Sequence, residues 1–279
     1  MGAPDLTEGD FRSIAAIVRS ETGIVLGQAK KGLVVSRLSR RLRDLRLPDF
    51  AAYRALIEGP TGARERRALI SAMTTNVTAF FREDHHFRHL ADTVLPPLLA
   101  AARAGGRVRL WSAGCSTGEE PYSLAITLLE LCPEAARHDI LILATDIDPA
   151  VLDRARAGTY AEAQLAGLSP ARRARFLHKE GAAGPWRVSG DLQELIRFEE
   201  LNLHATWPFA GRFDAILCRN VTIYFDAPTQ ARLWERLAGA LTAEGHLYIG
   251  HSERIEGPAA DHFLPLGQTR YRRAAPRAL

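Results

Sequence analysis

The sequence predicts an α/β protein: a parallel sheet flanked by helices, preceded by an all-α domain and carrying a small inserted β subdomain. Three observations predict this. Up to about residue 80, apolar residues recur only at helical spacing. Beyond that point, short apolar strands alternate with helices, which is typical of a parallel sheet. Residues 168–195 interrupt the alternation with a basic helix and a Gly-rich turn. We expect an all-α domain over 1–80 and an α/β domain over 81–279.

The N-terminal domain is predicted to contain four helices. Phe11, Ile14 and Val18 recur on one helical face, and proline and glycine separate the later segments. The expected helices cover 10–21, 30–47, 49–58 and 64–73.

The second domain shows the strand–helix alternation. Residues 140–145 form a continuous apolar run, as in a strand that is buried on both faces. Strands are expected over 107–112, 140–145, 213–218 and 246–250. Helices are expected over 121–132, 149–157 and 229–241.

Composition excludes several classes of protein. The 279 residues are 47% hydrophobic and 24% charged, which is ordinary for a globular chain. Neither a signal peptide nor an apolar run long enough to span a membrane is visible, so we expect a cytoplasmic protein. Three cysteines without a Cys-x-x-Cys pair predict neither a disulfide framework nor a zinc site. The net charge of +4 permits an acidic partner.

Two signals at the carboxyl ends of strands point to a nucleoside site. Gly114 and Gly118 lie in the turn after the first strand, where they allow backbone to approach a ligand, although a structural turn alone also explains them. Asp146 ends the second strand, where a carboxylate can hydrogen-bond both hydroxyls of a ribose. Asp148 precedes Pro149 and is expected to cap the next helix. Without a third glycine for a pyrophosphate, the pattern suits S-adenosylmethionine.

The chain also resembles a known family, the chemotaxis receptor methyltransferases (CheR family). Six blocks in the same order carry the resemblance: residues 74–83 (TTNVTAFFRE), 116–123 (STGEEPYS), 144–148 (ATDID), 213–226 (FDAILCRNVTIYFD), 250–253 (GHSE) and 267–269 (GQT). The resemblance implies a Rossmann-like S-adenosylmethionine-dependent methyltransferase sheet. It also implies transfer of a methyl group to glutamate carboxylates of chemotaxis receptors, which gives methyl esters and S-adenosylhomocysteine.

The resemblance further implies a set of site residues. Tyr224 and Arg82 are the catalytic candidates; the alternatives are a core tyrosine and an interdomain salt bridge. Glu120 is preferred over Glu119 as a cofactor contact. The implied cofactor-binding residues are Asn76, Thr78, Arg82, Glu120, Asp146, Asn202, Leu203, Arg219 and Asn220.

A basic helical stripe supplies the expected substrate contact. Between Lys30 and Arg46 there are seven Lys/Arg and one Asp. On a helical wheel, one arc holds Lys30, Arg37, Arg40 and Arg41. In the family the helical domain contacts the glutamate-rich methylation helices of receptors, and a basic stripe would speed that encounter. The alternative is an ordinary solvated face.

Other functions remain as alternatives. His85, His86 and His251 have no ligand partners at useful spacing, so we expect no metal. The loop 179–185 is shorter than in relatives that hold a receptor's C-terminal peptide, which argues against such tethering, and we expect a monomer. A nucleic-acid methyltransferase or another protein methyltransferase is one rival, but residues 220–224 lack the prolines typical of the nucleic-acid enzymes. A non-catalytic receptor adaptor is the other.

Overall fold

The computed structural model describes residues 5–275, which form two compact units. One contains the chain through Thr75 together with Tyr224–Thr229, and the other contains Asn76–Ile223 and the chain from Gln230 onward. This division lies a few residues before the one expected near residue 80. It also assigns Tyr224–Thr229, a short segment from the second half of the chain, to the helical unit, which sequence order alone does not indicate. No helix among the described residues is long and apolar enough to cross a membrane.

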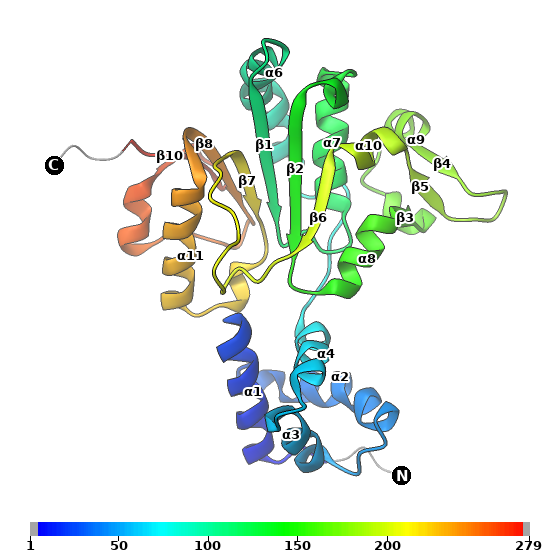
Figure 1. Ribbon diagram of the computed structural model, residues 1–279, viewed down its shortest axis with the longest axis vertical. Helices are drawn as coiled ribbons and strands as arrows, with labels where there is room; N and C mark the ends of the chain where they lie inside the picture. The colour runs from blue at the N-terminus through cyan, green and yellow to red at the C-terminus, as the bar shows by residue number, and fades with distance from the viewer. Residues whose placement is uncertain (1–4, 276–279) are drawn as a thin grey trace. The chain divides into compact units, whose positions relative to one another are not determined.

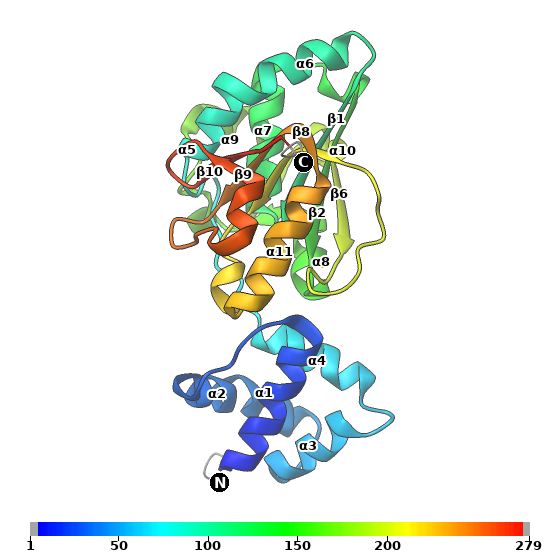
Figure 2. The same cartoon turned by 90° about the vertical axis from the view of Figure 1, so that its left-hand side faces the viewer.

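The first unit consists of four helices around an apolar core, coloured blue to cyan in Figure 2. Thr7 accepts a hydrogen bond from the Asp10 N–H, and Asp49 accepts one from the Ala52 N–H, so side-chain caps start two of the helices. Tyr224 packs against the core of this unit. The helices are α1 (Glu8–Thr22), α2 (Lys31–Asp44), α3 (Phe50–Glu58) and α4 (Ala63–Met73).

The second unit is built on a seven-stranded sheet with the order β6-β2-β1-β7-β8-β10-β9. The strands from β6 to β8 are parallel, and β10 runs antiparallel to β8 and β9. Figure 1 shows β1 and β2 side by side with their arrowheads at the same edge. The strands are β1 (Arg107–Ala113), β2 (Asp139–Asp146), β6 (Ile196–Glu200), β7 (Phe213–Cys218), β8 (Leu241–Ile249), β9 (Phe263–Pro265) and β10 (Arg270–Arg273).

Helices connect these strands. The helix expected over 149–157 has both predicted ends, because Asp148 caps its start and Gly158 adopts the left-handed conformation at its end. The helices are α5 (His85–His89), a π-helical turn η2 (Leu90–Val94), α6 (Leu95–Arg103), α7 (Glu119–Leu131), α8 (Pro149–Ala157) and α11 (Ala227–Ala240). The 3₁₀ turns are η1 (Gln28–Lys30), η3 (Ala135–Arg137), η4 (Glu162–Leu165), η5 (Thr222–Tyr224) and η6 (Gly257–His262).

The inserted subdomain is a three-stranded sheet with the order β3-β5-β4. Its first strand lies before the expected range of 168–195, because a two-residue strand has no periodicity to detect. The elements are β3 (Thr159–Tyr160), α9 (Pro170–Phe176), β4 (Leu177–Lys179), β5 (Trp186–Val188) and α10 (Gly190–Glu194).

The strand order fixes where a ligand can bind. From β1 the chain builds outward through β2 to β6, and then crosses to β7 on the other side of β1. The order therefore reverses between β1 and β7, and in open α/β sheets ligands bind at the carboxyl ends of such strands.

Candidate functional site

The turn after β1 is shaped by two glycines in the left-handed region. A Cβ on Gly114 would lie 2.5 Å from Cγ2 of Val221, and one on Gly118 would lie 2.9 Å from Cβ of Ala155 and from the hydroxyl of Tyr160. Both glycines therefore make room for protein atoms. Gly114 lets the loops after β1 and β7 approach each other, and Gly118 makes room for Ala155 of α8 and Tyr160 of β3. That these glycines also let backbone approach a ligand stays a prediction.

Asp146 is held rigidly at the end of β2. Its carboxylate accepts hydrogen bonds from the N–H groups of Ser116, at 2.9 Å, and Asp148, at 3.0 Å. Its side chain is buried, and burial raises the pKa of Asp146 while the backbone N–H groups oppose that shift. Each oxygen retains acceptor capacity, which fits the two hydroxyls of a ribose.

Asn76 lies beside this carboxylate. Its amide donates to Oδ2 of Asp148 at 3.1 Å, and its carbonyl accepts from the Ser116 hydroxyl at 3.0 Å. The structure therefore brings Asn76 and Asp146 together around the β1–α7 turn.

A buried charge cluster lies at the carboxyl ends of β1 and β7. Arg219 has a side chain only 2% exposed, between Glu120 at 3.2 Å and Glu83 at 3.5 Å. Glu120 also accepts from the Ser112 hydroxyl at 2.7 Å. Burial raises the pKa of Glu120, and Arg219 opposes that shift. Within residues 5–275, the buried Nε of Arg219 and Oε2 of Glu83 have no hydrogen-bond partner.

The structure separates the two adjacent glutamates of α7. Glu119 accepts from the Thr117 hydroxyl at 2.6 Å and from the Gln164 amide at 3.3 Å, so it contacts the side of the inserted subdomain. Glu120 instead joins the cluster around Arg219. This geometry supports the choice of Glu120 as the cofactor contact.

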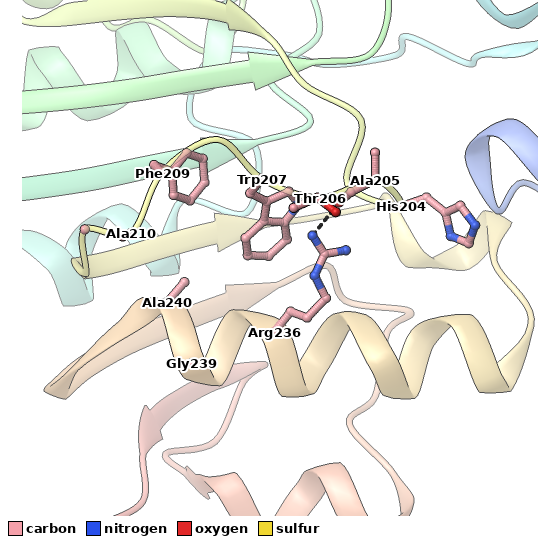
Figure 3. A pocket seen from close by; sticks show the side chains of 10 residues that line it. His204, Ala205, Thr206, Trp207, Phe209, Ala210, Arg236, Gly239 and Ala240 are labelled. Carbon is pink, nitrogen blue, oxygen red and sulfur yellow. Dashed lines mark hydrogen bonds between the residues drawn. The ribbon is translucent and has the colours of Figure 1, made fainter.

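The segment after β6 is held by an arginine that sequence reasoning missed. Arg236 on α11 donates to the carbonyls of Leu203, at 2.7 Å, and Ala205, at 2.5 Å, and its guanidinium lies 4.0 Å from the ring centre of Trp207. Figure 3 shows this arginine pointing from α11 toward the loop. Both line a pocket of about 440 Å³. Asn202 accepts from the His204 N–H at 2.9 Å. Arg236 contacts a loop that is distant from it in sequence, so no local motif could have identified this residue.

The contacts of the remaining candidates, Arg82, Thr78 and Tyr224, say less about their roles. Arg82 donates to the Val77 carbonyl at 2.9 Å, and its own carbonyl accepts from Arg219. Thr78 lies in the same segment, between α4 and α5, and is partly buried. Tyr224 belongs to the helical unit, where its carbonyl accepts from the Val25 N–H at 2.8 Å and Lys30 lies 5.3 Å from its ring centre. Its catalytic role stays a prediction.

Two residues of the basic stripe have internal partners. Arg37 donates to the carbonyls of Ala72 and Thr74, at 3.1 and 2.8 Å, and so closes the end of α4. Arg41 forms a two-point ion pair with Glu65, whose side chain is only 7% exposed. Contact of these two residues with substrate stays a prediction, since both guanidinium groups already have partners within the helical unit. Arg40 is 85% exposed at its side chain, and Lys30 is partly buried.

The histidines have structural contacts. His86 and His85 both contact the Gln268 carbonyl, and His251 contacts Glu83. Burial is the main cause that lowers the pKa of His86 to about 3.

One group of potential metal ligands occurs in the described part of the chain, and it combines a thiol, a carboxylate and an imidazole. Cys132, Glu134 and His138 place ligand atoms within 4.8 Å of one another. Arg103, however, donates to Glu134 at 2.9 Å, so a guanidinium already neutralises this carboxylate. The sequence argument, which considered cysteine pairs, did not find this group.

The sheet order, the β1–α7 turn and the carboxylate ending β2 define an α/β domain of the S-adenosylmethionine-dependent methyltransferase class. The chain matches the model of the CheR methyltransferase all-alpha domain over residues 9–74 and that of the CheR methyltransferase SAM binding domain over residues 76–272. It belongs to the CheR methyltransferase family, and its cofactor is S-adenosylmethionine.

Similar proteins extend over nearly the whole chain. A probable chemotaxis protein methyltransferase of Rhizobium etli is 52% identical over 92% of this chain and 96% of its own length. Chemotaxis protein methyltransferase 2 of Pseudomonas aeruginosa is 45% identical over 95% and 93%, respectively. The chemotaxis protein methyltransferase of Escherichia coli is 41% identical over 95% and 91%.

Proposed function

We propose that this protein transfers the methyl group of S-adenosylmethionine to glutamate side chains on the cytoplasmic helices of chemotaxis receptors. The observation that carries the proposal is full-length similarity, at 41–52% identity, to proteins named chemotaxis protein methyltransferases. We further propose that the protein acts as a monomer in the cytoplasm, and that no receptor tail tethers it.

The proposed cofactor contacts use opposite charges at one end and a carboxylate at the other. Asp146 accepts from the ribose hydroxyls, with Asn76 bracing the turn beside it through Asp148. Glu120 and Arg219 offer a carboxylate and a guanidinium, which match the ammonium and carboxylate of an amino acid. Arg82, Thr78, Asn202, Leu203 and Asn220 complete the proposed set.

The chemistry explains why a strong general base is not needed. A glutamate side chain has a pKa of about 4.3 and is already ionised at neutral pH. When bound, S-adenosylmethionine supplies an electrophilic methyl group on a sulfonium centre. The protein must align the carboxylate with that methyl group and exclude water. We propose that Arg82 and Tyr224 orient the substrate carboxylate.

Recognition of the receptor is proposed to use the exposed cations of the helical unit. Arg40 is the most exposed of the four stripe residues, and Arg43 lies on the same helix, also exposed. Such charges attract a glutamate-rich helix and are screened by salt.

The test is a methylation assay with labelled cofactor. The protein is incubated with S-adenosylmethionine carrying a tritiated methyl group and a cytoplasmic receptor fragment. We expect label in the fragment that base releases as methanol, because methyl esters hydrolyse and N-methyl groups do not. A fragment whose methylation-site glutamates are replaced by alanine is the matched control.

Each rival gives a different result. Base-stable label, or label transferred to added RNA or DNA instead of the fragment, would contradict the proposal. Tight binding of S-adenosylhomocysteine without any transfer would identify a non-catalytic adaptor.

A further inference from the structure

Glu253 is a buried carboxylate that the cofactor and substrate contacts above do not use. It lies in the turn that follows β8, is 3% exposed, and belongs to the Gly250–Glu253 block. Its oxygens accept from the N–H groups of Asn220 at 2.9 Å, Val221 at 2.9 Å and Thr222 at 2.7 Å. They also accept from the Thr222 hydroxyl at 2.8 Å and the Gly250 N–H at 2.5 Å.

Four of these five hydrogen bonds come from residues 220–222 and hold the loop that follows β7, while the Gly250 bond is local to the turn after β8. Three consecutive backbone N–H groups point at one carboxylate, and among residues 5–275 Glu253 forms no ion pair. Hydrogen bonds to an ionised acceptor are about twice as strong as neutral ones. One side chain from the turn after β8 therefore meets all three N–H groups of residues 220–222, while the Thr222 carbonyl accepts from the Gln230 amide at 2.8 Å.

Asn220 adopts the left-handed conformation, with a φ of 59°. Asparagine tolerates this region better than most non-glycine residues, and the contacts around Asn220 hold it there. Gly250 lies against it: a Cβ there would be 2.4 Å from Nδ2 of Asn220 and 2.8 Å from its backbone nitrogen. The glycine makes room for Asn220, and the glutamate three residues later fixes its N–H.

We propose that Glu253 is a positioning residue for cofactor binding, acting through Asn220. The inference rests on the proposed cofactor role of that residue. In it, Glu253 touches no substrate; it sets the direction of the segment that faces the methionine end of S-adenosylmethionine. The resemblance included residues 250–253 but assigned them no role. In this proposal they support Asn220.

The test compares Glu253→Gln with Glu256→Gln, the same substitution at an exposed residue in the next turn. Glutamine keeps the shape but presents an NH₂ group to some of the N–H donors. We expect the dissociation constant for S-adenosylhomocysteine to rise at least ~10-fold, as the loss of charge-assisted bonds implies. The Glu256 variant should bind like the wild type. Calorimetric titration measures affinity, and a thermal melt confirms that each variant is folded.

A purely structural role is separated by a double variant. If Glu253 acts through Asn220, Asn220→Ala weakens binding and adding Glu253→Gln weakens it little further. Additive losses, or wild-type affinity in a folded Glu253→Gln protein, would overturn the inference. If that variant does not fold, Gly250→Ala disturbs the same contact from the other side and should weaken binding; unchanged affinity there would also overturn it. Wild-type affinity of Asn220→Ala would remove the underlying cofactor assignment of Asn220, and with it this inference.

Discussion

Replacing Asp146 with alanine tests the cofactor site most directly. The carboxylate ends β2, and two backbone N–H groups, at 2.9 and 3.0 Å, fix both of its oxygens. A ribose would meet an acceptor that is already oriented. Alanine removes the acceptor without adding bulk, so the loss reports on hydrogen bonding.

The magnitude follows from the number of bonds. A hydrogen bond to a charged group contributes about 1.5–3 kcal/mol, and about 1.4 kcal/mol corresponds to a tenfold change in affinity. One lost ribose bond therefore predicts at least a ~10-fold weaker complex, and two predict at least ~100-fold. The substitution also leaves the N–H groups of Ser116 and Asp148 without this acceptor, so we expect a lower melting temperature.

Calorimetric titration with S-adenosylhomocysteine, on protein shown to be folded by circular dichroism, measures the loss. Asp139→Ala is the matched control, because Asp139 begins the same strand and pairs at the surface with Arg109. We expect the control to bind like the wild type. An Asp146→Ala affinity within about threefold of the wild type would refute the ribose assignment, since that is less than one charged hydrogen bond.

Four further changes test other parts of the structure. Arg236→Ala removes the hydrogen bonds to the carbonyls of Leu203 and Ala205. We expect a higher KM for S-adenosylmethionine with kcat little changed, and a lower kcat alone would contradict this. Arg40→Glu with Arg43→Glu should slow receptor methylation at low salt without changing cofactor affinity; equal rates would mean that the face is only solvated. Tyr224→Phe should lower the single-turnover rate at saturating cofactor; a lower melting temperature with an unchanged rate indicates a core tyrosine. Burial is the main cause that lowers the pKa of His86 to about 3, so its stabilising contribution is present above pH 6.5 and is lost progressively as the pH falls toward 3. Urea unfolding at pH 7.5 and 5 should show a smaller pH dependence in His86→Gln than in the wild type.

The sequence predicted those elements whose ends carry local signals. Helix α8 has a capping aspartate and proline at its start and a glycine at its end, and both bounds were predicted. Strand β8 was predicted from 246 but begins at Leu241, because its register against β7 shifts between Phe213 and Ala215. The segment from His85 to Arg103 was not assigned; a π-helical turn and two prolines disrupt its periodicity.

The candidate site was predictable only for residues within recognisable blocks. Asp146 and Arg219 lie at strand ends, where the sheet gathers its ligands, and the structure gives each a defined set of partners. Arg236 lies on α11 outside any recognised block, and Glu253 ends the 250–253 block, but each acts on a loop that is distant in sequence. Nothing in their local sequence indicates which carbonyl or N–H groups they meet, so only the fold reveals these contacts.

The basic stripe shows why charge spacing alone cannot define a docking surface. Arg40 and Arg41 are adjacent in sequence, and both have acidic partners. The Arg40–Asp44 pair, at 3.9 Å, has side chains that are 85% and 57% exposed, whereas the Arg41–Glu65 pair, at 2.5 Å, has side chains that are 34% and 7% exposed.

The two pairs differ in what an incoming acidic helix can do. An exposed pair contributes about 0–1 kcal/mol, so Arg40 can exchange Asp44 for a receptor glutamate at little cost. Breaking the Arg41 pair would leave Glu65 buried without its charge partner, which costs several kcal/mol. Tyr53 also donates to Glu65 at 3.0 Å, so this carboxylate is fixed in the helical core and cannot follow Arg41 toward solvent. We therefore propose that recognition by this face uses Arg40 and its exposed neighbours, while Arg41 holds the helix that presents them in place.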